Sequence, residues 1–338
     1  MENVTRWITR VYSVLRSLLA LLSVTVLPIR TTGKTVTRAA HTGYCRTLTT
    51  RLAGRIRGCD GQDLRHSSHR ASGRSLVITG AVGTGSLSAL LPSGVAVCEL
   101  FADPLHIDLY PQEAAVVAGA VDKRRREFAA VRLCARAALR RIGVTPGPIV
   151  PGPKGAPQWP DGVVGSMTHC DGYRAAAVAH RAMFASIGID AEPHAALPDG
   201  VERMTALPEE RAALSRLAVT HPRIHWDRLL FSAKESVYKA WFPLTGRWLD
   251  FMECVITPDP ECHTFTADFT VPGPVVAGER LSRFTGRWHA GGDARHVVTA
   301  VTVPWPAGSP GGENRSYENL GAHAPRPHAG RHDHRAGW

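Results

Sequence analysis

Residues 163–193 read VVGSMTHCDGYRAAAVAHRAMFASIGIDAEP, and this stretch sets the plan of the fold. Its first part, 163–179, carries two short apolar segments around the turn Cys170-Asp171-Gly172, which predicts a β-hairpin. Its last part, 183–191, is an apolar run that ends shortly before Pro193, which predicts a buried strand. The centre of the chain is therefore expected to be a series of neighbouring strands.

Two strong helical patterns flank this centre. Residues 122–142 place Phe128, Val131, Ala135, Leu139 and Ile142 on one side of a helix, and residues 225–242 do the same with Trp226, Leu230, Ala233, Val237 and Ala240. A polar connection is expected at 193–210, and short β runs follow at 254–257, 264–271, 284–289 and 296–303. The order helix, strands, helix, strands predicts an α+β fold of two halves with a similar plan.

The two ends of the chain differ from this body in charge. Residues 1–75 hold 13 basic and 3 acidic side chains, whereas residues 76–304 hold 23 of each. A basic field that would suit nucleic acid is thus confined to the first segment. We expect residues 1–77 to be a basic extension, disordered or created by a start codon assigned too early, and the Gly/Pro/His-rich residues 305–338 to be a disordered tail.

Two features bear on the compartment. The apolar run at 17–28 is shorter than the roughly 20 residues that cross a bilayer, and no small-x-small cleavage site follows it. The seven cysteines are scattered singly with no CxxC spacing, which indicates reduced thiols rather than a disulfide framework or a zinc site. We therefore expect a cytoplasmic protein with no membrane and no nucleic-acid partner. A tethered or nucleic-acid-binding protein that depends on residues 1–75 is the alternative from another class.

Paired carboxylates mark the end of the predicted buried strand. On a strand, side chains alternate between faces, so Asp190 and Glu192 share one face while Ile189 and Ala191 face a core. Two carboxylates side by side repel each other unless a cation or a buried proton relieves them, and oxygen-ligated hard cations are one such relief. Two solvated acids on an exposed strand are the simpler explanation of this pattern.

A second pair lies on the second helix. Glu235 and Lys239 are four residues apart and thus neighbours on one helix face, which often means no more than a surface ion pair. Here the helix continues into the apolar and aromatic residues 240–245, which suit the wall of a pocket for an apolar arm.

The first helix is strongly basic. It carries eight cations against Asp122 and Glu127, and Arg125, Arg132 and Arg136 fall near one face. Arginine suits phosphate recognition because it donates paired hydrogen bonds, although a solvated face is the ordinary alternative. A serine-histidine triad at Ser166 and His169 is rejected, since alternation points these two side chains in opposite directions.

Taken in order, the segments 124–139, 152–179, 187–194 and 225–249 resemble the 4′-phosphopantetheinyl transferases of the surfactin/enterobactin-synthetase component D type, closest to high-GC bacterial members. The resemblance covers about residues 78–304. It implies two pseudo-twofold-related α+β halves in one monomer, 78–184 and 185–304, with coenzyme A and Mg²⁺ between them. It also implies transfer of the 4′-phosphopantetheine arm to a serine of an apo acyl or peptidyl carrier protein of polyketide, peptide or fatty acid synthases.

The resemblance assigns roles to particular residues. Metal binding falls on Asp190, Glu192 and Glu235, with Ala191 contributing through its backbone. Contacts to coenzyme A fall on Arg124, Arg132, Lys154, Thr168, His169, Lys239 and Leu249, as well as on Asp190 and Glu235. Glu235 is our choice for the base that deprotonates the carrier serine, and Lys239 neutralises the diphosphate as adenosine 3′,5′-bisphosphate leaves.

One position departs from close relatives, which carry a lysine where this chain has Pro151. Lys154 is retained, so the grip on the 3′-phosphate is expected either to be weaker or to come from Lys154 alone. A Mg²⁺-dependent hydrolase of coenzyme A or a related diphosphate is the alternative that keeps the same pocket, with water in place of the serine.

Because every chemical motif lies beyond residue 120, residues 1–75 are predicted to be dispensable. A chain beginning at Val77 should fold and transfer normally. Thermal melting of the shortened protein checks the first point, and loss of its cooperative transition would contradict the prediction.

Overall fold

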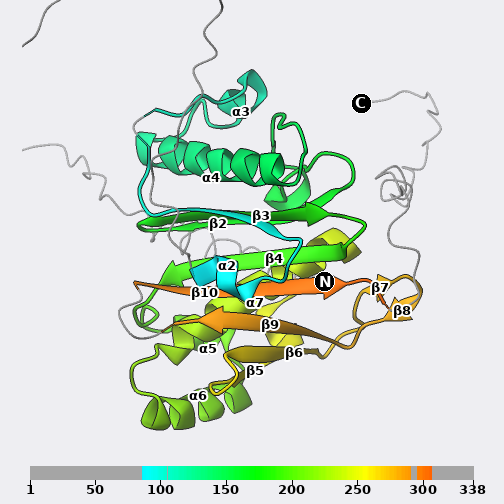
Figure 1. The fold of residues 1–338 in the computed structure, drawn as a ribbon. Helices are drawn as coiled ribbons and strands as arrows, with labels where there is room; N and C mark the ends of the chain where they lie inside the picture. The colour runs from blue at the N-terminus through cyan, green and yellow to red at the C-terminus, as the bar shows by residue number, and fades with distance from the viewer. Residues whose placement is uncertain (1–85, 105, 291–294, 307–338) are drawn as a thin grey trace, which may run out of the picture. The chain divides into compact units, whose positions relative to one another are not determined.

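Two antiparallel sheets meet along one edge in the computed structural model, which describes residues 86–104, 106–290 and 295–306 (Figure 1). The first sheet has the order β1-β3-β2 and the second the order β4-β10-β9-β6-β5. The strands are β1 (Ala96–Leu100), β2 (Val163–Cys170), β3 (Tyr173–His180), β4 (Phe184–Pro193), β5 (Cys254–Asp259), β6 (Thr264–Phe269), β9 (Arg283–His289) and β10 (His296–Pro304), and a separate ribbon pairs β7 (Val275–Val276) with β8 (Glu279–Arg280).

Each sheet has one long helix packed on it. These helices are α4 (Asp122–Arg141) on the first sheet and α7 (Trp226–Thr245) on the second, and both match the predicted spans to within a few residues. The shorter helices are α2 (Ser86–Leu90), α3 (Pro111–Val116), α5 (Val201–Thr205), α6 (Pro208–Thr220) and the 3-10 turns η1 (Pro153–Gly155) and η2 (Phe251–Glu253). The architecture confirms the predicted α+β fold with antiparallel sheets.

The segment predicted as a polar connection at 193–210 instead contains α5 and the start of α6. Pro208 occupies the first turn of α6, where its missing N–H costs nothing, and the Glu210 carboxylate accepts the Leu207 N–H at 2.7 Å. Only two residues of α6, Glu210 and Leu214, are buried, so its apolar pattern is too sparse to reveal the helix.

The expected extension 1–77 and, apart from Trp305 and Pro306, the expected tail lie outside the described residues. Among the helices that the structure describes, none combines the length and the apolar character needed to cross a bilayer.

The edge where the sheets meet has side-chain hydroxyls in place of a backbone ladder. Ser166 Oγ accepts a hydrogen bond from the Ile189 N–H at 3.1 Å, and Thr168 Oγ1 accepts one from the Ala191 N–H at 3.1 Å. These bonds join β2 to β4 and satisfy backbone donors that would otherwise be buried without partners. A shared core lies along this edge, where Leu87 of α2 is buried in one cluster with Ile189 of β4 and Val298 of β10.

Helix α7 lies close against the backbone of β4 at Gly188. A Cβ added at Gly188 would lie 1.9 Å from the Ser236 carbonyl oxygen and 2.6 Å from the Ala240 backbone nitrogen. Only glycine allows the helix backbone to come this near, and the Ser186 hydroxyl donates to the Ala240 carbonyl at 2.8 Å beside it. The approach places the α7 residue Glu235 close to the β4 residue Asp190.

Gly188→Ala is therefore expected to force α7 away from β4. The clash is with backbone, which cannot move aside as a side chain can, so the cost should reach about 3 kcal/mol or more. Thermal melting and transfer activity should both fall. Gly147→Ala serves as the control because an added Cβ there meets nothing within 4 Å. Equal melting temperatures for the two variants would contradict the packing argument.

Candidate functional site

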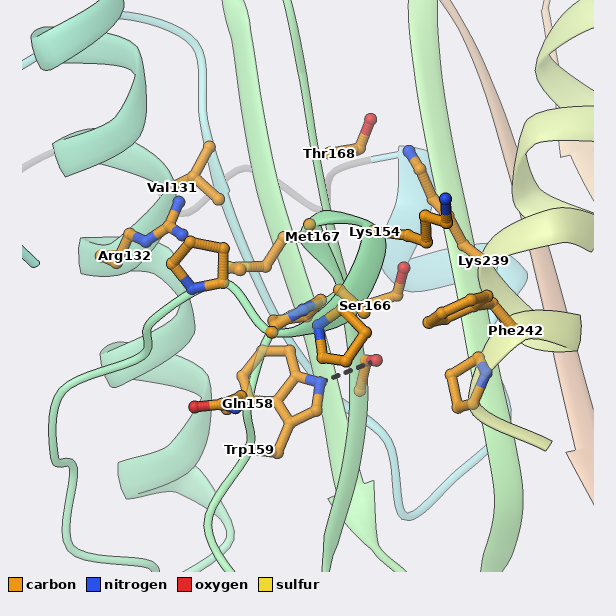
Figure 2. Close-up of a pocket in the computed structure, with 18 of the residues that line it drawn as sticks. Val131, Arg132, Lys154, Gln158, Trp159, Ser166, Met167, Thr168, Lys239 and Phe242 are labelled. Carbon is orange, nitrogen blue, oxygen red and sulfur yellow. Dashed lines mark hydrogen bonds between the residues drawn. The ribbon is translucent and has the colours of Figure 1, made fainter. Parts of the chain in front are cut away.

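A cavity of about 920 Å³ opens where the two sheets meet. It is lined by α4, the loop 151–159, β2 and α7, so both halves of the fold contribute to it. Figure 2 shows Arg132 of α4 on one side, Lys239 and Phe242 of α7 on the other, and Thr168 and Met167 of β2 between them. Of the predicted site residues, the cavity wall includes Arg124, Arg132, Lys154, Thr168, His169, Glu235 and Lys239.

Asp190 is the centre of the polar network at the α7 side. Lys239 Nζ donates to its Oδ1 at 2.7 Å, Thr168 Oγ1 donates to the same oxygen at 3.2 Å, and Ser232 Oγ donates to Oδ2 at 2.8 Å. Asp190 itself is buried, and it reaches the cavity through Lys239 and Thr168, which line it. Donors from β2 and α7 thus converge on one carboxylate of β4.

Glu235 lines the same end of the cavity one turn before Lys239. Burial raises the pKa of Glu235 to about 7, an effect that Lys239 opposes and Asp190 reinforces. A carboxylate with such a pKa suits proton transfer near neutral pH. Burial alone would lower the pKa of Lys239, but Asp190, Glu235 and Glu192 together raise it, so Lys239 stays an ammonium.

Glu192 lies on the same face of β4 as Asp190, as strand alternation predicts, yet its partner is different. Its Oε2 accepts a hydrogen bond from Arg228 Nη1 at 2.9 Å. Burial raises the pKa of Glu192, Asp190 adds to the rise, and Arg228 counteracts it. Ala191, between the two acids, buries its side chain in the core and donates its N–H to Thr168.

The carboxylates have the chemistry of a hard-cation site. Asp190, Glu192 and Glu235 all offer carboxylate oxygens, and the charge of Asp190 raises the pKa of both Glu192 and Glu235, a repulsion that a divalent cation would relieve. Across residues 86–104, 106–290 and 295–306, however, no three His, Cys, Asp or Glu side chains converge closely enough to hold a metal ion. The predicted ligands therefore fit Mg²⁺ in kind, and their convergence on it stays a prediction.

The α4 side of the cavity is cationic. Arg132 donates to the Ile149 carbonyl at 3.2 Å, and its guanidinium lies 3.3 Å from the centre of the Phe128 ring. Arg124 donates to His169 Nε2 at 3.1 Å, so the neutral imidazole carries its proton on Nδ1. Burial and the neighbouring cations hold the pKa of His169 well below its usual value, which keeps it neutral.

The basic stripe predicted on α4 divides in the structure. Arg136 is buried against Glu113 at 2.8 Å and Arg125 donates to the Ala118 and Ala120 carbonyls, so neither faces the cavity. Arg124 and Arg132 alone of the α4 arginines line it. A buried carboxylate on a separate helix, which the local spacing does not reveal, captures Arg136.

Leu249 is placed apart from the other predicted contacts. It is buried in the core between α7 and the second sheet and is not part of the cavity wall. Pro151 does line the cavity and pairs with Pro157 across the loop, while Lys154 adopts a left-handed backbone with φ of 55°.

Several residues of the site were not predicted. Glu127 lies 3.7 Å from His169, Ser232 donates to Asp190, and the Trp159 indole in the cavity wall donates to the Gly165 carbonyl at 2.9 Å (Figure 2). Glu127 lies three and four residues after Arg124 and Lys123 on the predicted helix, and this spacing could have indicated that it belongs to the cationic side of the site. Nothing in the local pattern marks Ser232.

Lys234, which precedes Glu235 on α7, stabilises the packing of α7 and does not face the cavity. Lys234 donates to Glu210 at 2.7 Å and to the Phe251 carbonyl at 2.6 Å, and both side chains are almost fully buried. Glu210 also accepts the Ile256 N–H at 2.7 Å. This pair ties α7 to α6, η2 and β5 behind the cavity.

Comparison with known proteins agrees with this geometry. The model for the 4′-phosphopantetheinyl transferase N-terminal domain matches residues 112–179, and that for the 4′-phosphopantetheinyl transferase superfamily matches residues 186–295. The 4′-phosphopantetheinyl transferase Svp of Streptomyces mobaraensis is 59% identical over 227 residues, 66% of this chain and 91% of Svp. PptT of Mycobacterium tuberculosis is 47% identical over 231 residues (66% and 99%), and Npt of Nocardia iowensis is 50% identical over 210 (60% and 93%).

The chain therefore belongs to the 4′-phosphopantetheinyl transferase family. This confirms both the resemblance and the activity expected from the sequence, transfer of the 4′-phosphopantetheine arm of coenzyme A to a carrier protein.

Replacing the two lysines of α7 by alanine is predicted to have different effects, one mainly on stability and the other mainly on the rate of transfer. Lys234→Ala leaves Glu210 buried without its cation and should cost about 3–5 kcal/mol of stability. Lys239→Ala should cost less, about 1–3 kcal/mol, because the Lys239 side chain is 27% exposed and Asp190 keeps its hydrogen bonds from Ser232 and Thr168. The transfer rate of folded Lys239→Ala should nevertheless fall by about 10²–10³-fold. Urea unfolding and single-turnover transfer measure the two effects, and the reverse ranking would contradict the assignment.

Proposed function

We propose that this cavity carries out Mg²⁺-dependent transfer of the 4′-phosphopantetheine arm to the hydroxyl of a carrier-protein serine, releasing adenosine 3′,5′-bisphosphate. The observation that supports this most directly is the convergence of Asp190, Glu235 and Lys239 at one end of a cavity whose other side carries Arg124 and Arg132. A diphosphate ester needs cations along its length and a base at the reacting phosphorus, and the two sides supply them.

The cationic side is proposed to hold the nucleotide end of coenzyme A. Arg132 and Arg124 donate to its phosphates, His169 donates from Nδ1, and Lys154 grips the 3′-phosphate from the loop. Thr168 lines the cavity, and its one hydroxyl hydrogen either stays on Asp190 or turns to a phosphate oxygen of the ligand. Phe242 and Tyr238 provide the apolar wall for the pantetheine arm, whereas Leu249 supports that wall from the core behind it.

The reacting end is proposed to use Glu235 and Lys239. Glu235 takes the proton from the carrier serine as the serine oxygen attacks the β-phosphorus, and Lys239 leaves Asp190 to neutralise the oxygen of the departing bisphosphate. Asp190, Glu192 and Glu235 are the carboxylates that would hold Mg²⁺, with Ala191 contributing through its backbone, and the ion would supply charge stabilisation on the diphosphate when bound.

The partners of the enzyme, its compartment and its oligomeric state are also proposals. Apo carrier proteins or domains of polyketide, nonribosomal peptide or fatty acid synthases are the proposed partners, and the enzyme is proposed to act as a cytoplasmic monomer. The two halves, 78–184 and 185–304, are proposed to meet at the cavity, and residues 1–77 and 305–338 to have no part in transfer. A net charge of zero over residues 76–304 agrees with a partner other than nucleic acid.

Mass spectrometry tests the reaction. Apo carrier protein incubated with this protein, coenzyme A and Mg²⁺ should gain the mass of one phosphopantetheine, and EDTA should prevent it. Release of free 4′-phosphopantetheine with no mass gain on the carrier would favour the diphosphate hydrolase instead.

Binding and catalysis should separate in steady-state kinetics. Glu235→Gln keeps the size of the side chain but removes its basicity, so kcat should fall about 10²–10⁴-fold. Arg132→Ala should mainly raise the KM for coenzyme A, by roughly ten- to hundredfold for a lost charged hydrogen bond. Arg140→Ala, an exposed arginine at the far end of α4, is the matched control. A Glu235→Gln variant with unchanged kcat would contradict the assignment of Glu235 as the base.

A further inference from the structure

The two carboxylate oxygens of Asp190 have different surroundings. Oδ1 accepts hydrogen bonds from Lys239 at 2.7 Å and from Thr168 at 3.2 Å, and both of these residues line the cavity. Oδ2 accepts a hydrogen bond from Ser232 Oγ at 2.8 Å, and Ser232 is fully buried behind the cavity wall. One oxygen of the carboxylate is therefore held from the cavity and the other from the core.

Thr299 of β10 is the second residue on the core side. It lies directly opposite Asp190 in the antiparallel ladder of β10 and β4, so the two side chains share the face of the sheet that α7 covers. Thr299 is fully buried, and its Oγ1 donates to the Ser232 carbonyl at 2.9 Å and lies 3.0 Å from Ser232 Oγ. Residues of β4, α7 and β10 thus meet at one buried hydroxyl group.

The hydrogens of these groups fix the direction of each bond. A carboxylate only accepts, so the single hydroxyl hydrogen of Ser232 goes to Asp190, and that of Thr299 goes to one of the two Ser232 oxygens. A serine inside a helix often returns its hydrogen to a carbonyl of the preceding turn, as Ser236 does to Ala233 at 2.8 Å. Ser232 instead directs its hydrogen out of the helix toward Asp190.

We infer that Ser232 and Thr299 are positioning residues, which hold Asp190 by Oδ2 and so keep Oδ1 turned toward the metal ion and the diphosphate. The inference rests on the proposed metal site. Lys239 and Thr168 can turn to an entering phosphate because they line the cavity, whereas Ser232 lies behind it and stays on Asp190. The carboxylate therefore keeps its orientation when its two other donors leave.

A pair of buried serines on α7 tests this role. Ser232→Ala and Ser236→Ala each remove one buried hydroxyl from the same helix, so both should lower the melting temperature in EDTA by roughly 2–6 °C. The affinity for Mn²⁺, measured by electron paramagnetic resonance with coenzyme A and no carrier protein, should fall about tenfold in Ser232→Ala and stay within twofold in Ser236→Ala. Equal Mn²⁺ affinities in the two variants would overturn the inference.

Thr299 is tested by variants that keep or remove its hydroxyl. Thr299→Val should weaken Mn²⁺ binding about threefold, and Thr299→Ser, which retains the hydroxyl, should bind as the unaltered protein does. Because Thr299 acts through Ser232, Ser232→Ala combined with Thr299→Val should bind no more weakly than Ser232→Ala alone. Losses that multiply in the double variant would overturn the role of Thr299.

Two further outcomes keep the inference separate from the proposed function. Should Ser232→Ala not fold, Ser232→Cys keeps a similar volume with a poor donor, and its Mn²⁺ affinity should still fall. An unaltered protein that binds no Mn²⁺ in the presence of coenzyme A would overturn the metal site and this inference with it. Normal binding by the unaltered protein and by both Ser232 variants would overturn the inference alone and leave the proposed transfer standing.

Discussion

The backbone contact between α7 and β4 at Gly188 is the constraint on which the site depends. A helix normally stands off a strand by the length of the side chains between them, but here the Ser236 carbonyl would lie 1.9 Å from any Cβ at position 188. The close approach brings the acidic face of β4 within hydrogen-bonding reach of α7. Ser232 and Lys239 can then both contact Asp190, although 42 and 49 residues separate them from it.

The cations in the cavity wall and behind it fall into two kinds. Arg228 and Lys234 are buried, make several hydrogen bonds and hold segments of the chain together. Arg124, Arg132 and Lys239 line the cavity. Fixed cations lower the cost of burying carboxylates, and movable or cavity-lining cations remain for the ligand. A site that binds a highly charged molecule needs both, since it must be stable before the ligand arrives.

The sequence predicted what local periodicity encodes. The spans of α4 and α7, the hairpin of β2 and β3, and the shared face of Asp190 and Glu192 all follow from repeats of 3.6 or 2 residues. Contacts between residues that are distant in the chain do not follow from such repeats. The capture of Arg136 by Glu113, the fixation of Glu192 by Arg228 and the burial of Leu249 depend on packing between elements. The family resemblance supplied the residues of the site, and geometry then separated those that line the cavity from those behind it.

Because hydroxyl groups bridge β2 and β4, the distance between the two sheets depends on the length of the side chains that carry them. A backbone ladder would fix neighbouring strands at about 4.8 Å, whereas Ser166 and Thr168 insert one side-chain oxygen into each connection. Arg124 and Arg132 of α4 stand on one side of that gap, and the carboxylates of β4 and α7 stand on the other. The lengths of the Ser166 and Thr168 side chains therefore set how far apart the cationic and acidic walls of the cavity lie, and one added atom at either position would widen the space between them.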